Sequence, residues 1–352
     1  MLALLACALL AAGMTPAPTP VVPAGVAPSP ATVEREVVLM GTRAEVRVTA
    51  ADRRAALAGS EAAVRALEAA ERRLSTWGES GELARLNRAP AGEAVHLSPE
   101  LAGELARAEA CSRATGGAFD PAVGPLVAAW GLRSGGRLPS AAEIARARAA
   151  SAPLGLELRA DGTAVRARPD LVLDEGGFGK GAGLDAAVAA VGAVAGVAGA
   201  ELDLGGQVGL LGGARRETGE EIEIADPRRR DRAVATLRVG SGSVATSGNS
   251  ERGLVVDGRR VGHLLDPRTG RPAPDFGSLT VWAPTGLEAD CLSTGLYVLG
   301  PRKALAWAAA HPGVEVVVAR PGLGGVVRIT GSAGLSGRLR AIEGRSEIEL
   351  LN

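Results

Sequence analysis

LDEGGFGKGAGLD, residues 173–185, contains five glycines, one lysine and three acidic residues. Glycine is unfavourable inside helices and strands, so this density indicates a place where the chain turns sharply or comes close to a ligand. The preceding residues 169–173 have the apolar pattern of a strand, and the alanines and valines after Lys180 have that of a buried helix. We therefore expect the stretch to join a strand to a helix N-terminus, where free N–H groups favour anionic ligands.

From the residues alone, this stretch is a structural loop, a nucleotide phosphate site or a metal site. A P-loop is excluded, because its template requires Ser or Thr after the lysine and Gly181 stands there. The second glycine-rich segment, GGQVGLLGG at residues 205–213, lacks the glycine spacing of a dinucleotide-binding fold. A tight structural loop and a ligand site remain equally open.

Strand and helix patterns alternate irregularly on both sides of this stretch. Residues 34–49 predict two strand-like runs broken at Gly41, as a hairpin or a bulged strand, and Asp161-Gly162 predicts a hairpin turn. Helical spacing occurs at residues 53–74, 101–115, 180–194 and about 287–298. Strands mixed with a few helices predict an α+β fold with a largely antiparallel sheet and packed helices.

Composition limits the classes of function. The chain has 352 residues, enough for one large domain or two intimately packed ones. Lys plus Arg and Asp plus Glu both number 39, so no basic surface indicates a nucleic-acid partner. The three cysteines, Cys7, Cys111 and Cys291, have no paired spacing, and we expect neither a zinc site nor a disulfide.

The N-terminus has the pattern of an export signal. Residues 1–14 form an apolar run too short to span a bilayer, and residues 15–32 are a proline-rich tether, so folding is expected from residue 33 to residue 352. LLAC, which ends at Cys7, is similar to the lipobox of bacterial lipoproteins. We expect export to the periplasmic side of the inner membrane, with a lipid anchor at Cys7 as the alternative to a cleaved signal.

Two further motifs carry candidate chemistry. Asp290 and Thr294 lie four residues apart on an expected helix, so both oxygens share one face and suit Mg²⁺. The alternative is an exposed Asp and a Thr bonded to its own helix. His263, one of three histidines, precedes an Asp-Pro turn, where it is either structural or a general acid or base.

The order of these motifs along the chain resembles the ApbE family of FAD:protein FMN transferases. The matching blocks run from about Val37 to Gly300, most of the folded chain. HLLDPRTG followed by ADCLSTGLYVLG is the most specific pair. The other blocks are VVLMGTRAEV, LSTWGESGELARLN, GGAFDPAVGPLVAAWG, LDEGGFGKGAGLD, DLGGQV and VATSGNSERG.

The resemblance implies a two-lobed, T-fold-related transferase domain over residues 33–352. It also implies an exported, Mg²⁺-dependent enzyme that binds FAD. Such an enzyme moves FMN onto a Ser or Thr hydroxyl of a partner flavoprotein and releases AMP. The alternatives are a Mg²⁺-dependent FAD pyrophosphatase, which uses water instead of the protein hydroxyl, and a non-enzymatic FAD-binding lipoprotein.

The family's site residues carry over by position. Asp290 and Thr294 match side-chain ligands of Mg²⁺, and Gly177 matches a residue that offers its backbone carbonyl. The positions that line the FAD site are Met40, Trp77, Ala118, Phe119, Asp120, Asp174, Lys180 and His263. His263 is the candidate catalytic residue that assists deprotonation of the incoming hydroxyl, with Asp266 as its orienting partner. Trp77 replaces a Tyr that many relatives carry.

Overall fold

The computed structural model describes residues 29–151, 155–212, 219–249, 254–256 and 258–351. The expected export segment, Cys7 and nearly all of the proline-rich tether lie outside these ranges. The first strand begins at Ala31, two residues before the expected start of the domain. Within the described ranges, no helix combines the length and the apolar character needed to cross a bilayer.

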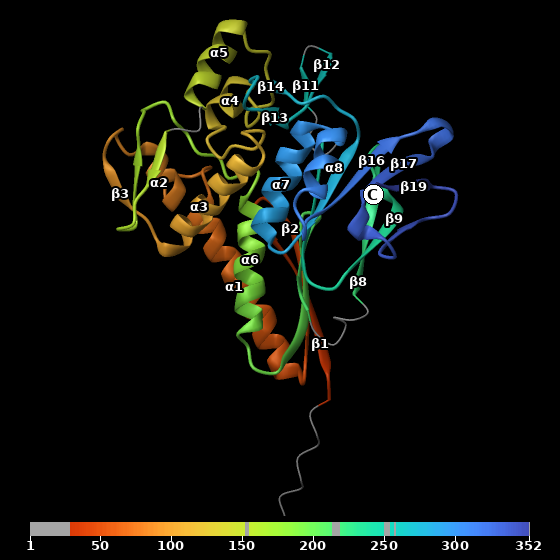
Figure 1. Cartoon of the computed structure of the whole chain (residues 1–352). Coiled ribbons are helices and arrows are strands. Elements are labelled where there is room, and N and C mark those ends of the chain that lie inside the picture. The colour runs from red at the N-terminus through yellow and green to blue at the C-terminus, as the bar shows by residue number, and fades with distance from the viewer. Residues whose placement is uncertain (1–28, 152–154, 213–218, 250–253, 257, 352) are drawn as a thin grey trace, which may run out of the picture.

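A nine-stranded sheet forms the centre of the molecule (Figure 1). Its neighbours pair antiparallel except β17 and β19, which are parallel, so the expected α+β class with a largely antiparallel sheet is confirmed. In spatial order its strands are β1 (Ala31–Leu39), β2 (Thr42–Ala50), β6 (Val197–Leu204), β7 (Gln207–Leu211), β10 (Gly242–Gly248), β15 (Ser278–Ala283), β16 (Glu315–Pro321), β17 (Val327–Ser332) and β19 (Ser346–Leu351).

Smaller sheets flank the main one. Two have three strands: β18 (Leu339–Ala341), β9 (Arg229–Val239) and β8 (Glu220–Asp226), then β3 (Ala94–His96), β5 (Thr163–Arg166) and β4 (Leu156–Leu158). Two are short hairpins: β11 (Leu254–Val256) with β12 (Arg259–Val261), and β13 (Leu265–Asp266) with β14 (Arg271–Pro272). In Figure 1 the sheet of β3, β5 and β4 and the sheet of β18, β9 and β8 lie on opposite sides of the molecule.

Four helices pack against the main sheet: α1 (Arg53–Leu74), α6 (Gly179–Gly192), α7 (Gly286–Leu299) and α8 (Pro301–Ala309). Asp52 caps α1 by accepting a hydrogen bond from the backbone N–H of Ala55. The remaining helices are α2 (Glu82–Arg88), α3 (Pro99–Ala114), α4 (Gly124–Ala129), α5 (Ala141–Ala150) and the short 3₁₀ turns Leu323–Gly325 and Ala333–Leu335. The largest buried apolar cluster includes residues from α3 and α7 and from β15 and β16.

Helices α6 and α7 meet with backbone against backbone. A Cβ on Gly181 would lie 2.1 Å from the carbonyl oxygen of Gly286, and a Cβ on Gly286 would lie 2.5 Å from that of Gly181. Real Cβ atoms do not approach so closely, so both positions require glycine. Part of the glycine density in residues 173–185 therefore serves helix packing.

The strand expected at residues 169–173 is wrong. The segment forms no strand, and part of its backbone bonds to other segments instead. The Asn87 side chain donates to the carbonyl of Leu173 and accepts from its N–H, both at 2.8 Å. Val172 accepts from the N–H of Gly124, and Asp174 donates to the carbonyl of Pro121. These partners are a side chain and a neighbouring loop, which an apolar pattern cannot distinguish from a strand.

The cysteine expectation is also wrong. Cys111 on α3 and Cys291 on α7 form a disulfide between residues 180 positions apart in sequence. Spacing gave no signal of it, because the two helices meet only through the tertiary fold.

The disulfide generates a stability prediction. A loop of this length is expected to contribute roughly 3–5 kcal/mol to folding, so a reducing agent should lower the melting temperature by roughly 5 °C. Calorimetry of the wild type and the Cys111→Ala/Cys291→Ala double variant, each with and without dithiothreitol, measures this. The double variant should melt low in both conditions. A wild type with the same melting temperature in both contradicts the prediction.

Candidate functional site

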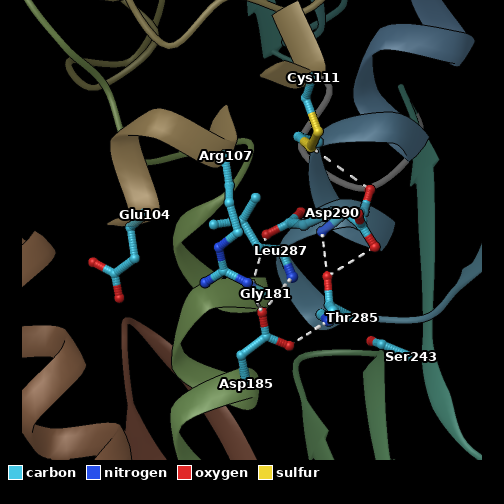
Figure 2. A network of polar contacts seen from close by, with 12 residues as sticks. Glu104, Arg107, Cys111, Gly181, Asp185, Ser243, Thr285, Leu287 and Asp290 are labelled. Carbon is cyan, nitrogen blue, oxygen red and sulfur yellow. Dashed lines mark hydrogen bonds and ion pairs between the residues drawn. A yellow bond between two sulfur atoms is a disulfide. The ribbon is translucent and has the colours of Figure 1, made fainter. Parts of the chain in front are cut away.

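Two aspartates hold the N-termini of α6 and α7 together (Figure 2). Asp290 of α7 accepts from the N–H of Gly181 at 3.0 Å. Asp185 of α6 accepts from the N–H groups of Gly286 and Leu287 at 2.5 and 3.3 Å. Each carboxylate lies at the other helix's N-terminus, where free N–H groups and the helix dipole stabilise negative charge.

Helix α3 supports this junction from one side. Arg107 forms an ion pair with Asp185 at 2.9 Å. One turn further along α3, Cys111 is joined to Cys291, the residue after Asp290. The junction is thus tied to α3 twice, through the Asp185 carboxylate and through Cys291, the neighbour of Asp290.

The carboxylate of Asp290 also faces a cation. Its side chain is only 6% exposed, and the ammonium of Lys180 lies 3.2 Å from its Oδ1. Burying a carboxylate is costly unless it is paired and hydrogen-bonded. The resemblance placed Asp290 and Lys180 in one site, and the structure brings them into contact.

The expected metal ligands gather at this junction. Asp290 and Thr294 are one turn apart on α7. A Cβ on Gly177 would lie 3.5 Å from the hydroxyl oxygen of Thr294, so the glycine loop runs beside that side chain. Among the described residues, no cluster of three or more His, Cys, Asp or Glu side chains could hold a metal. The available donors are one carboxylate, one hydroxyl and one backbone carbonyl, the hard oxygens that suit Mg²⁺ when water and phosphate complete its shell.

Residues 118–120 lie against the same loop. Ala118, Phe119 and Asp120 are all buried. The ring of Phe119 would touch a Cβ on Gly177, at 3.1 Å. Asp120 accepts from the backbone N–H of Ala122 at 2.8 Å. Burial raises the pKa of the Asp120 carboxyl to about 6, which makes it partly protonated near neutral pH.

Asp174 and Trp77 meet through a residue that the sequence analysis missed. Arg133 donates to Asp174 at 2.6 Å and to Glu175 at 3.2 Å. Its guanidinium carbon lies 4.7 Å from the ring centre of Trp77. Arg133 and Asp174 also line a pocket of about 430 Å³, next to Thr76. An arginine in a loop after α4 gave no sequence signal, because its partners come from two distant segments.

Met40 lies in the turn between β1 and β2. It has a left-handed φ of 52°, unusual outside glycine, and its N–H donates to Glu71 at 2.9 Å. Its sulfur would lie 2.9 Å from a Cβ on Gly183 of α6. The turn therefore packs directly on the helix that follows the glycine loop.

His263 lies beside the β13–β14 hairpin. The side chain of Asn249 accepts from the N–H of Leu264 at 3.3 Å and would touch a Cβ on Gly262 at 2.5 Å, so it fixes the backbone on both sides of the histidine. Both carboxylate oxygens of Asp266 are bound by Arg268. The orienting role of Asp266 toward His263 stays a prediction.

The sequence did not predict a place in the site for Asp185 or for its partners Gly286 and Arg107. The available signal was the position of Asp185 one turn after Gly181 on the expected helix. No pattern in the sequence pairs it with the start of another helix 101 residues later.

Comparisons with known proteins identify the family of this chain. The sequence profile of the ApbE family matches residues 40–318. A curated FAD:protein FMN transferase of Rhodobacter capsulatus is 36% identical over 75% of this chain, and the match spans only half of that relative's length. The relative of the same name from Klebsiella pneumoniae is 33% identical, over 86% of this chain and 87% of its own.

Solved structures show the same fold. The flavin transferase ApbE from Vibrio cholerae superposes with a TM-score of 0.76 at 26% identity, over 88% of this chain and all of that one. The ApbE protein from Thermotoga maritima gives a TM-score of 0.75 at 27% identity, over 89% and 97% of the two chains. The resemblance expected from the motifs is confirmed, and the chain belongs to the ApbE family.

Proposed function

We propose that this protein is a Mg²⁺-dependent FAD:protein FMN transferase. It would move the FMN half of FAD onto a Ser or Thr hydroxyl of a partner flavoprotein and release AMP. The observation that carries the proposal is the α6–α7 junction, where the buried Asp290 faces Lys180 and Thr294 adjoins the bare backbone of Gly177. Membership of a family whose matched relatives bear this name supports it.

The reaction exchanges the phosphoanhydride bond of FAD for a phosphate ester bond to the acceptor. The acceptor oxygen attacks the FMN phosphorus, the bond from that phosphorus to the bridging oxygen breaks, and AMP leaves with that oxygen. Catalysis of this kind depends mostly on positioning and on neutralising charge. Lys180 supplies positive charge at the junction, and Asp290, Thr294 and Gly177 would hold the ion. When bound, Mg²⁺ supplies further neutralisation of the diphosphate.

His263 would take the proton of the attacking hydroxyl on its imidazole. Histidine suits this task because its unperturbed pKa lies near neutral pH. Trp77, Met40 and the buried segment 118–120 would bind FAD, as their family positions imply.

We also propose that residues 1–14 direct export and that the protein works outside the cytoplasm. It is either anchored to the membrane by a lipid on Cys7 or released when the signal is cleaved. The Cys111–Cys291 disulfide supports this location, because disulfides persist in oxidising compartments such as the bacterial periplasm.

One assay tests the proposed reaction. The purified chain is incubated with FAD, Mg²⁺ and an acceptor domain that carries a flavinylation threonine, while AMP release and acceptor mass are followed together. A gain of FMN less water by the acceptor, lost with EDTA, is the expected result. AMP and free FMN without an adduct, across several acceptors, would establish a pyrophosphatase instead. The absence of AMP under every condition would contradict both the transferase and the pyrophosphatase activity.

Thr294 offers a matched pair of metal-site variants. We expect Thr294→Val to slow AMP release by at least about 100-fold, because the substitution removes an oxygen ligand of the ion that neutralises the diphosphate. Thr294→Ser keeps the hydroxyl and should retain most of the activity. Rates are measured over a range of Mg²⁺ concentrations. Equal rates for the two variants would contradict the role of Thr294 as a metal ligand.

His263→Ala should slow acceptor flavinylation by roughly 100-fold or more, the usual loss when a general base is removed. The residual rate should rise with pH without the inflection that the wild type shows, since hydroxide replaces the base. FAD affinity is measured alongside by fluorescence. A variant with the full transfer rate and the wild-type pH profile contradicts the role.

Asp120 generates a prediction on pH and stability. Its folded pKa, about 6, lies above the ordinary 3.8, so the destabilisation it causes is absent below about pH 4 and complete above about pH 6. Asp120→Asn should therefore raise the melting temperature relative to wild type more at pH 7 than at pH 4. The exposed Asp161→Asn is the control and should show no such increase. An equal difference at both pH values contradicts the prediction.

A further inference from the structure

Trp77 is an exposed aromatic side chain in an unusual setting. It follows α1 in a loop, and 70% of its surface is accessible to solvent. One face of the ring is covered by the guanidinium of Arg133, whose central carbon lies 4.7 Å from the ring centre. Since most of the residue is still accessible, the opposite face of the indole is open to a ligand.

Arg133 is itself fixed in place. It binds Asp174 and Glu175, whose side chains are only 10% and 13% exposed. Charge-assisted hydrogen bonds to poorly solvated carboxylates are stronger than ordinary ones. Thr76, the neighbour of Trp77, donates to the same Glu175 at 2.5 Å. The loop that carries Trp77 and the arginine that covers it are thus connected to one pair of acidic residues.

The loop that carries Arg133 is tightly built. Within it, Gly131 accepts from the N–H groups of both Ser134 and Gly136. The preceding Trp130 is buried, and its indole N–H donates to the carbonyl of Gly270 at 2.8 Å. A guanidinium on so constrained a loop loses little freedom by covering an aromatic ring, and Arg suits this use better than Lys because it is planar.

We propose that Arg133 is a positioning residue for FAD binding: it holds the indole of Trp77 from behind so that the open face stacks on a ring of FAD. The inference rests on the proposed function, since it takes FAD as the substrate. Pre-ordering an exposed ring reduces the entropy lost on binding, so the contact should act on affinity and not on the chemical step.

The test measures FAD affinity of the full-length chain by flavin fluorescence anisotropy, without acceptor. Arg133→Met keeps the aliphatic stem and removes the guanidinium, Trp77→Leu removes the ring, and a third variant combines both. Arg133→Lys keeps a positive charge that can pair with Asp174 and Glu175. Arg65→Met, an exposed arginine on α1, is the matched control. Melting curves verify that each variant is folded.

We expect Kd for FAD to rise roughly fivefold to twentyfold in Arg133→Met and in Trp77→Leu. The double variant should be no weaker than Trp77→Leu alone, because Arg133 acts through the indole. Arg133→Lys should fall between the wild type and Arg133→Met. In a separate assay with acceptor and saturating FAD, the rate of flavinylation should change less than twofold in Arg133→Met, and Arg65→Met should match the wild type.

Three results would overturn the inference. Unchanged affinity in Arg133→Met would show that the contact with Trp77 is only structural, and tighter binding would show that Arg133 obstructs the site. Fully additive losses in the double variant would show that the two residues act separately. A wild type that binds no FAD would instead overturn the proposed function. Separate titrations with FMN and AMP identify the stacked ring, since only the matching ligand should lose affinity in Trp77→Leu.

Discussion

The N-terminal ends of α6 and α7 lie so close that neither Gly181 nor Gly286 can carry a side chain. Two free helix termini at this distance would place like partial charges together, which is unfavourable. The structure resolves this with one carboxylate from each helix, Asp290 and Asp185, bound to the N–H groups of the other. This exchange fixes the spacing and the direction of both helices.

The candidate site is a consequence of that exchange. Because Asp290 must reach Gly181, it is buried at the end of the glycine loop and faces Lys180. The next turn of α7 then brings Thr294 against Gly177. Helix α3 stabilises the same junction through Arg107 and through the disulfide between Cys111 and Cys291. Thus helix packing arranges the residues proposed to hold Mg²⁺.

Local patterns predicted the elements whose signal lies within them. Helix α1 was expected at residues 53–74 and has those bounds, and the first hairpin turns at Gly41 as expected. Short helices were missed, although Ser140 and Glu143 form a capping box that marks the start of α5. The prediction of a strand before the glycine loop was wrong because the backbone partners of that segment lie in other segments. The disulfide and the role of Arg133 were not predicted for the same reason, since both depend on which segments the fold brings together.

We propose that the α6–α7 junction binds a divalent ion through Asp290, Thr294 and the carbonyl of Gly177. Anomalous diffraction from crystals grown with FAD and Mn²⁺, a detectable substitute for Mg²⁺, tests it most directly. We expect a manganese peak roughly 2.1 Å from one oxygen of each of these three residues, with the FAD diphosphate completing the shell. A peak elsewhere, or Lys180 still paired with Asp290 and no ion at the junction, would contradict it.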